Sequence, residues 1–513
     1  MSVLSDHYDW VVLGDHPGAL LSGTLAAKLG LSVLILPLAP GARAMISNSR
    51  QCLDPEPNYV LGMGRIGRSH GLLRECLNHL GLTSSESEFI QQKHFSPQVM
   101  TPSSRVCFTF EDDPFLRELQ REFGEETAEK LALVRALRRS EHLTLSYWYG
   151  LPARLSLAKN KTQNPEAPIT TQQLRRRLNR VAKRASAEER AWFMADESVE
   201  GLAERLARPD LAETCKGLWF GVASVEAEKL ALVDLIQMLA LGRTGASFQG
   251  GMTAYREFLL RMAKRLGAQV PAKMECRRLF VENGRFVGVQ IAHRGNMISV
   301  GGGVLGCSLD HVRDRVTQSG KSWMRKLKSA PVPRGWRFTL GLTVHAEALP
   351  PGMTSQAVWQ EPGAPVLSIE VADPSDYGLI EPENRLIFVR TVLPFTRESL
   401  NVEYQRMISA RMLRQVTEIF PFLEYHLKRV YPDFRAAATE PLSEAYGFAS
   451  PEMIPENLRS ISAGGVGSRS GVEGLFVASG ESFPELGSMG GTVAGIEATA
   501  WIAHRSGLPG PMN

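Results

Sequence analysis

The first part of the chain contains the pattern that most constrains its fold: a buried strand, a glycine turn, an apolar helix and a second buried strand. Tyr8 to Leu13 (YDWVVL) is rich in strand-forming residues and ends at Gly14, and Ser32 to Leu36 (SVLIL) is a second apolar run. Between them, Gly18 to Leu29 predicts a helix of small and apolar residues that stops at Gly30. Uninterrupted apolar strands are typical of a parallel sheet covered on both faces. The order and length predict a βαβ unit of the dinucleotide-binding kind.

Length and charge exclude several other classes of protein. The chain has 513 residues, which suggests roughly three domains at about 150 residues each. Its formal net charge of +4 is too small to indicate a nucleic-acid-binding protein. No apolar run approaches the roughly 18 residues of a transmembrane helix. The first residues, MSVLSDHYDW, lack the basic and apolar regions of a signal peptide. We therefore expect a cytoplasmic protein.

Cysteine usage agrees with that expectation. The six cysteines are widely scattered and form no CxxC motif: Cys52, Cys76, Cys107, Cys215, Cys276 and Cys307. This arrangement is typical of reduced thiols and predicts neither a disulfide framework nor a zinc site. The sequence therefore predicts no metal site.

The middle of the chain, from about residue 110 to 240, is highly charged and is expected to be mostly helical. Within it, Leu174 to Arg184 (LRRRLNRVAKR) has six basic residues and a narrow apolar stripe. Two interpretations stay open. The segment is either a solvated helix with one packed stripe, or a helix that lies on an anionic membrane surface or partner.

Later segments alternate between clear helix and strand patterns. Thr253 to Leu266 repeats apolar residues at helical spacing and ends at Gly267. The dipeptide Asn283-Gly284, between two apolar runs, predicts a β-hairpin. Further strands are expected at Trp336 to Val344, Val366 to Val371, Leu386 to Val392 and Leu475 to Ser479, with a long helix from about Glu403 to Ile419 and an apolar helix after a glycine-rich turn at the C-terminal end.

Three distant blocks together resemble the FAD-dependent oxidoreductases of the amine oxidase and phytoene desaturase superfamily. They are the βαβ start, the stretch from Phe248 to Ile291 that begins FQGGMTAYREF, and the stretch LFVASGESFPELGSMGGTVAGIEATAWIAH from Leu475 to His504. The resemblance implies an α/β fold. Its Rossmann-like FAD-binding domain would be assembled from residues 1–60, 245–330 and 455–513. Residues 61–244 and 331–454 would form a second, α+β substrate domain that includes a helical subdomain.

The resemblance also implies which residues hold the cofactor. Gly14 matches the first glycine of the dinucleotide turn, and Cys276 takes the place of a residue, commonly valine, whose main chain holds the adenine. Gly480 and Glu481 match the Gly-Asp pair at the phosphate–ribityl part of FAD. Gly490, Gly491 and Thr492 match the helix N-terminus that faces the flavin. At such positions glycine lets the main chain approach the cofactor, and the helix dipole offsets negative charge.

The chain departs from the family pattern at the dinucleotide turn. GxGxxG would need glycines at positions 14, 16 and 19, but the chain has His16 and Ala19, with Gly18 as a partial substitute. The second glycine normally lets the backbone touch the pyrophosphate. Pro17 removes a donor, and Pro37 stands where an acidic residue would hold the ribose. Two alternatives follow: His16 donates a hydrogen bond to a phosphate and FAD is retained, or the cofactor site has been lost.

These alternatives lead to different functions. The first is an oxidoreductase that transfers hydride to FAD from an apolar or amine-type small molecule. A lipophilic, desaturase-like substrate is favoured over an amine because the sequence contains no evident aromatic cage. No catalytic residue is predicted. The second is a non-catalytic relative, with weakened or lost FAD binding, that binds a partner or a lipid. A third is a flavoprotein in peripheral contact with a membrane through the basic segment. Trp219, Phe220, Trp336 and Tyr446 are interpreted as core residues, although a substrate pocket would also use them.

Overall fold

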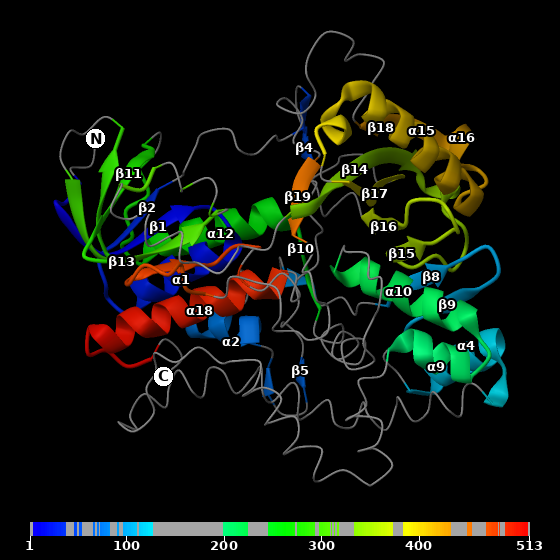
Figure 1. The fold of residues 1–513 in the computed structure, drawn as a ribbon, viewed down its shortest axis with the longest axis horizontal. Coiled ribbons are helices and arrows are strands. Elements are labelled where there is room, and N and C mark those ends of the chain that lie inside the picture. Colours follow the sequence, from blue (N-terminus) through cyan, green and yellow to red (C-terminus); the bar gives the residue numbers. More distant parts are fainter. Residues whose placement is uncertain are drawn as a thin grey trace.

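The structure is a computed structural model. It describes residues 4–36, 46–48, 51–53, 65–66, 69–70, 72–82, 90–91, 96–109, 112–126, 198–223, 245–271, 274–292, 297–307, 309, 312, 315–317, 333–372, 383–394, 396–431, 449–453, 468–480, 482 and 488–510. Figure 1 shows two sheets that lie side by side along the longest axis, each covered by helices. This arrangement confirms the predicted α/β class with a Rossmann-like unit.

The first sheet has six strands and contains the predicted βαβ unit. Strands β1 (His7–Gly14), β2 (Val33–Leu36), β13 (Met297–Gly306) and β20 (Leu475–Val477) are parallel, in the order β20-β13-β1-β2. Residue Gln269 extends the β2 edge, because its N–H donates to Val33 and its carbonyl accepts from Ile35. The sheet therefore combines segments from the beginning, middle and end of the sequence.

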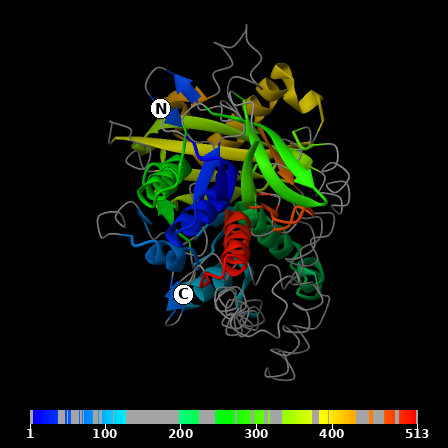
Figure 2. The ribbon, with the colours of Figure 1, turned by 90° about the vertical axis from the view of Figure 1, so that its left-hand side faces the viewer.

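Helices cover one face of this sheet. They are α1 (Pro17–Lys28), α2 (Leu72–His79), α12 (Gly251–Arg265) and α18 (Ser488–Arg505), and their apolar residues share one core with strand residues such as Val12, Ile35 and Val304. In Figure 2, α18 (red) lies close to α1 (blue). Helix α1 is buried from Pro17 to Ala27, which explains why its sequence has small and apolar residues on every side.

The other two strands of this sheet form a β-hairpin, which pairs antiparallel with β13 and packs its apolar residues on the other face. Strands β11 (Cys276–Glu282) and β12 (Arg285–Ile291) are joined by Asn283 and Gly284, which have φ angles of 50° and 80°. Both residues tolerate this left-handed region, so the predicted hairpin is confirmed with its turn. Apolar hairpin residues such as Phe286 and Val289 form a second core with Val11 and Leu305.

The glycine-rich segment at residues 301–303 is part of β13. A side chain at Gly302 would lie 2.8 Å from the Trp10 ring and 3.0 Å from the Trp501 ring. These tryptophans also pack with Phe476, at ring-centroid distances of 6.1 and 5.2 Å. Glycine is therefore used here to admit large aromatic rings against the strand, and not to make a turn.

The second sheet has eight strands in the order β18-β14-β17-β16-β15-β8-β9, with β19 also paired to β14. Its long central strands are β14 (Pro333–His345) and β17 (Asn384–Pro394). Helix α15 (Val402–Ile419) packs its apolar face on one side of the sheet. The remaining strands are β8 (Gln98–Met100), β9 (Arg105–Cys107), β15 (Gln356–Trp359), β16 (Leu367–Ala372), β18 (Leu427–Tyr431) and β19 (Ala449–Met453).

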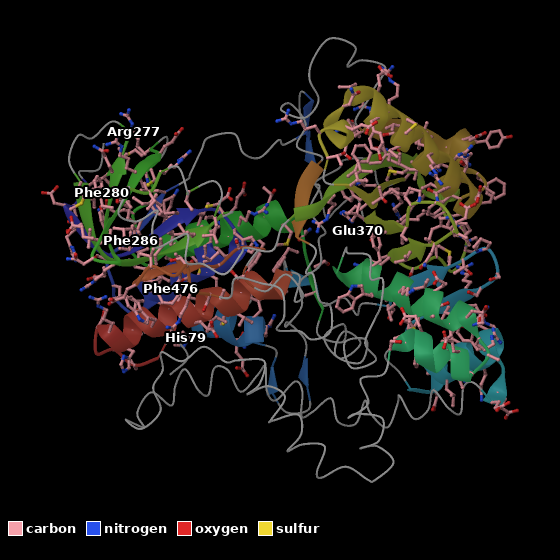
Figure 3. All side chains as sticks on the ribbon, in the orientation of Figure 1. His79, Arg277, Phe280, Phe286, Glu370 and Phe476 are labelled. Atoms are coloured by element: carbon pink, nitrogen blue, oxygen red, sulfur yellow. The ribbon has the colours of Figure 1, made fainter. Side chains whose placement is uncertain are left out.

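The opposite face of the second sheet carries a buried ion pair. Ile369 and Val389 face α15, so their neighbours Glu370 and Arg390 point to the other side of the sheet. Arg390 Nη1 lies 2.8 Å from Glu370 Oε2, and the two side chains are 3% and 10% exposed. Figure 3 shows Glu370 on this sheet, far from Phe286 and Phe476 of the first sheet. Because both groups are buried, removing either side chain would leave the charge of the other uncompensated at a cost in stability.

Further helices and short strands complete the described elements. Helix α10 (Pro209–Ala223) packs beside β8 and β15, where a side chain at Gly217 would meet Val99. The remaining ones are β3 (Ile46–Asn48), β4 (Gln51–Leu53), β5 (Arg65–Ile66), β6 (Ser69–His70), β7 (Ile90–Gln91), β10 (Ser247–Phe248), α4 (Asp112–Phe123), α9 (Val199–Arg205), η2 (Ala346–Ala348), η4 (Glu398–Leu400) and α16 (Leu423–His426).

Several sequence predictions concern these regions. Trp219 and Phe220 of α10 are buried, as predicted for core residues. The basic segment from Leu174 to Arg184 and Tyr446 lie outside the described residues, as does the side chain of Trp336. Among the helices that the structure describes, none has the length and hydropathy needed to cross a membrane.

We predict that Gly495→Ala destabilises the protein by about 1–3 kcal/mol, because the new methyl group would overlap the carbonyl oxygen of Gly18 and force α1 and α18 apart. The measurement is the urea midpoint. Gly341→Ala is the matched control, since its methyl group would lie 3.6 Å from Tyr431 Cβ, an ordinary contact. Equal midpoints for the two variants would contradict this tight helix contact.

We also predict that Arg390→Met costs about 3–5 kcal/mol of stability, because it leaves the buried Glu370 carboxylate without its partner. Adding Glu370→Gln in the same chain should recover part of the loss, since the uncompensated charge is then gone. Thermal unfolding of the two variants and the parent chain measures both effects. A double variant less stable than Arg390→Met alone would show that burial of the charge is not the cause.

Candidate cofactor site

The candidate site lies where strands β1 and β13 end side by side. Gly14 and Gly306 are register partners at the carboxyl ends of these parallel strands. From β1 the sheet continues to β2 on one side and to β13 and β20 on the other. Such a switch point, at the carboxyl ends of parallel strands, is where open α/β sheets bind ligands.

The turn after β1 requires glycine at its first position. Gly14 has a φ angle of 104°, and a side chain there would lie 2.5 Å from the carbonyl oxygen of Gly306. The left-handed backbone and the close approach of β13 each exclude a larger residue. The structure thus gives Gly14 the position that the sequence pattern predicts for the first glycine of a dinucleotide turn.

The glycine missing at position 19 is compensated on the neighbouring strand. Ala19 occupies the place of the third glycine, whose usual role is close packing between helix and strand. A side chain at Gly306 would lie 2.7 Å from Ala19 Cβ and 3.1 Å from the main-chain nitrogen of His16. Gly306 therefore makes room for the Ala19 methyl group.

Glycines also set the contact between α1 and α18. A Cβ at Gly18 would overlap the main chain of Gly491, and a Cβ at Gly495 would overlap the carbonyl oxygen of Gly18. The two helices therefore touch backbone to backbone near their N-terminal ends. This contact brings Gly18 and Gly491, both predicted site residues, directly together.

His16 lies at the same helix crossing. It is the N-cap residue of α1, and its Nδ1 accepts a hydrogen bond from the N–H of Gly18 at 3.2 Å. The imidazole ring rests against Gly491, because a Cβ there would overlap ring atom Cε1. A half-buried imidazole therefore stands between the starts of the two helices, where the family pattern has only main chain.

Local main-chain donors at the start of α1 are mostly engaged. The His16 N–H donates to Gly306 at 3.2 Å, and the Ala19 N–H donates to His16 at 3.0 Å. Pro17 has no N–H, and the Gly18 N–H is capped by the imidazole. Because Nδ1 acts as an acceptor, the neutral ring carries its proton on Nε2, which is then a donor. An anion at this crossing would therefore be contacted by a side chain instead of the usual glycine backbone.

The residues predicted to face the flavin belong to helix α18. Gly490, Gly491 and Thr492 lie near its start and are buried. The turn before it is held by Ser482, whose hydroxyl donates to Val477 at 2.8 Å and accepts from the N–H of Ser479 at 3.2 Å. Among the described residues, a side chain at the exposed Gly480 would meet no atom within 4 Å. Glu481 and Pro37 lie outside the described residues.

Cys276 occupies a separate part of the region. It begins β11 and is fully buried in the same apolar cluster as Leu36 at the end of β2. Its carbonyl oxygen accepts a hydrogen bond from Arg315 Nη1 at 2.7 Å. Burial raises the pKa of the Cys276 thiol to about 12, so the sulfur stays protonated. These facts agree with a small core residue whose side chain has no redox role.

Two residues of this site were not singled out from the sequence. Gly306 and Gly495 determine how closely β13 and α18 approach α1. Both lie in segments that contain several glycines, where the sequence alone does not show which structural role each one has. A usable signal for Gly306 was its position at the end of a buried strand. For Gly495 the signal was its spacing of four residues from Gly491, which places both on one face of the helix.

Comparisons with known proteins show which solved structures share this fold. No family model and no curated protein sequence matches the chain. Solved structures do match over nearly their whole length. An oxidoreductase from Methanosarcina mazei has a TM-score of 0.54 at 14% identity, with 94% of this chain and 99% of that chain covered. A wild-type putrescine oxidase bound to putrescine has a TM-score of 0.54 at 15% identity, covering 97% and 99%.

A third match extends the same group. Cyclohexylamine oxidase from Brevibacterium oxydans has a TM-score of 0.50 at 12% identity, with 98% of this chain and 99% of that chain covered. Such low identities show a shared fold and leave the chemistry to the residues of the site. The chain therefore has the fold of the putrescine oxidase and cyclohexylamine oxidase structures, an α/β fold with a Rossmann-like unit.

Proposed function

We propose that the protein is an FAD-dependent oxidoreductase that removes hydride from a small molecule. Residues 1–60, 245–330 and 455–513 would form its cofactor domain, and residues 61–244 and 331–454 its substrate domain. The observation that carries the proposal is the junction of β1, β13, α1 and α18, where Gly14, Gly306 and the Gly18–Gly491 contact leave main chain at the carboxyl ends of the strands.

The residues at this junction fit FAD, with one altered contact. Gly14 keeps side-chain atoms out of the turn after β1, which supports close approach of a dinucleotide there. His16 would replace the second glycine as a ligand: its Nδ1 is fixed by the Gly18 N–H, and Nε2–H would donate to a phosphate oxygen. Charge-assisted hydrogen bonds of this kind contribute about 1.5–3 kcal/mol.

Other predicted residues would complete the site. Gly480 and Glu481 would contact the phosphate–ribityl part, and Gly490, Gly491 and Thr492 would face the flavin. The main chain at Cys276 would hold the adenine through its N–H, since its carbonyl oxygen accepts from Arg315. When bound, FAD supplies the hydride-accepting group, and the protein positions the substrate C–H bond and excludes water.

The substrate class that we propose is an apolar or amine-type small molecule. The fold match to putrescine oxidase and cyclohexylamine oxidase supports amines as the first compounds to test. The absence of an evident aromatic cage in the sequence supports lipophilic polyenes as the second group.

We predict that the purified chain, mixed with excess FAD and desalted, retains about one flavin per chain, as measured by the visible absorbance spectrum. Under anaerobic conditions, a substrate from the amine or polyene group should bleach the flavin bands. A spectrum without flavin after desalting would contradict the proposal and favour the non-catalytic alternative, a partner- or lipid-binding protein.

We further predict that His16→Phe weakens FAD binding by about 10- to 100-fold, the range that corresponds to one lost charge-assisted hydrogen bond. The substitution keeps an aromatic ring against Gly491 but removes the Nε2 donor. Quenching of flavin fluorescence on titration measures the affinity, and thermal unfolding checks that the variant remains folded despite losing the helix cap.

His7→Phe is the matched control for this titration. His7 begins β1 at its far end, and its side chain is 58% exposed. The His7→Phe variant should bind FAD like the parent chain. If His16→Phe also binds FAD like the parent chain, the imidazole is not a phosphate ligand and the altered contact is wrong.

A further inference from the structure

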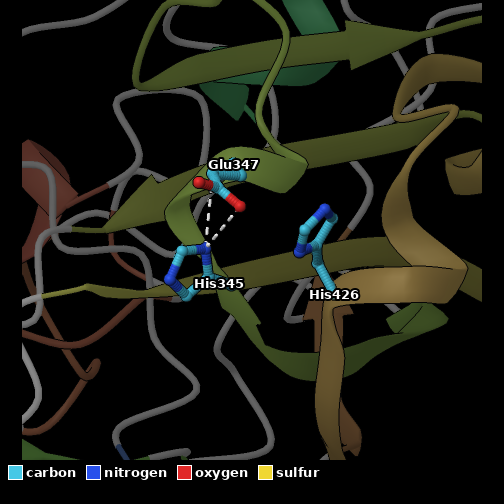
Figure 4. Close-up of side chains that lie close together, drawn as sticks. All are labelled: His345, Glu347 and His426. Atoms are coloured by element: carbon cyan, nitrogen blue, oxygen red, sulfur yellow. Dashed lines mark hydrogen bonds and ion pairs between the residues drawn. The ribbon is translucent and has the colours of Figure 1, made fainter.

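A cluster of three metal-ligating side chains lies outside the proposed cofactor site. His345 ends β14, Glu347 follows in η2, and His426 ends α16. One ligand atom from each residue can be chosen so that all three lie within 4.8 Å of one another. Figure 4 shows the Glu347 carboxylate beside His345, with the ring of His426 facing the same space.

The His345–Glu347 pair already has the spacing of two ligands on one ion. His345 Nδ1 lies 3.4 Å from Glu347 Oε2. With zinc–ligand bonds of about 2.0–2.2 Å, two ligand atoms in a tetrahedral site are separated by about 3.3–3.5 Å. The Glu347 side chain is 72% exposed, so its carboxylate has room to rotate toward His426.

The electrostatics of this pair favour a cation between the groups. Nδ1 of His345 accepts the N–H of Glu347 at 3.4 Å, so in the neutral ring this nitrogen presents a lone pair. A metal ion at Nδ1 would take the place of the Glu347 N–H, whose 3.4 Å contact with this nitrogen is long, and the carboxylate would attract the ion. His426 adds a second imidazole, whose ring centroid lies 5.7 Å from that of His345 with the planes 26° apart.

The ligand types in this cluster indicate which ion fits it. One divalent ion binds both unprotonated rings and the carboxylate together. Two imidazoles and one carboxylate suit zinc, whereas magnesium and calcium prefer oxygen ligands alone.

We propose that His345, Glu347 and His426 form a binding site for a divalent transition metal, Zn²⁺, which joins the end of β14 to α16. A water molecule would fill the fourth position, because the chain supplies three ligands. The ligand atoms lie within 4.8 Å of one another, so they must draw together by up to about 1.4 Å to reach the roughly 3.4 Å separation of a tetrahedral zinc site. None of these residues belongs to the proposed FAD site. The site contains no cysteine, so cysteine spacing carries no signal for it.

The test is isothermal titration of Zn²⁺ into the full chain, stripped of metal and purified without a histidine tag. Three variants remove one ligand each: His345→Asn, whose side chain still caps η2, Glu347→Gln, and His426→Gln. Each should weaken zinc binding at this site at least tenfold. His504→Gln, an exposed histidine on α18, is the control and should bind zinc like the parent chain. Mg²⁺ and Ca²⁺ should not compete.

A second measurement separates this site from cysteine binding and tests the link to α16. Zinc should slow hydrogen exchange of residues 423–431 in the parent chain and leave it unchanged in His426→Gln. With Co²⁺ the parent chain should show no thiolate charge-transfer band. The proposal is overturned if the parent chain binds no zinc at micromolar concentrations. It is also overturned if all three ligand variants bind zinc as tightly as the parent chain.

Discussion

The structure depends on the close approach of backbone to backbone around the start of α1. Gly14 meets Gly306 across two parallel strands, and Gly18 meets Gly491 and Gly495 across two helices. Each contact excludes even a methyl group. Because these glycines come from the beginning, middle and end of the chain, one tight junction fixes how three distant segments assemble. The candidate cofactor site is the surface that this junction leaves at the carboxyl ends of the strands.

His16 is the exception within this junction, and the structure explains how it is tolerated. In a turn built for glycine, an imidazole has room only because Gly491 has no side chain. The ring also occupies a main-chain donor, since its Nδ1 accepts the Gly18 N–H that would otherwise be available to an anion. The substitution at position 16 and the glycine at position 491 therefore belong together, although they lie at opposite ends of the sequence.

Local patterns allowed much of the fold to be predicted. The hairpin around Asn283 and Gly284 follows from two residues that both accept a positive φ angle, and the βαβ start follows from two apolar runs around a helix. Contacts between distant segments were not predictable in the same way. The role of Gly495 depends on which helix crosses α18, which no local periodicity contains. The partnership of His345 and Glu347 with His426 likewise arises only when β14 and α16 are placed side by side.

Strand β13 has different neighbours along its length. Its first half pairs antiparallel with β12, while its second half lies parallel to β20, which comes from the end of the sequence. During synthesis on the ribosome, residues 303–305 therefore lack this neighbour until β20 has been made. Until then the strand presents open main-chain groups and the apolar side of α1 lacks α18. Until β20 and α18 have joined the sheet, the nascent chain therefore exposes a strand edge of the kind that favours aggregation.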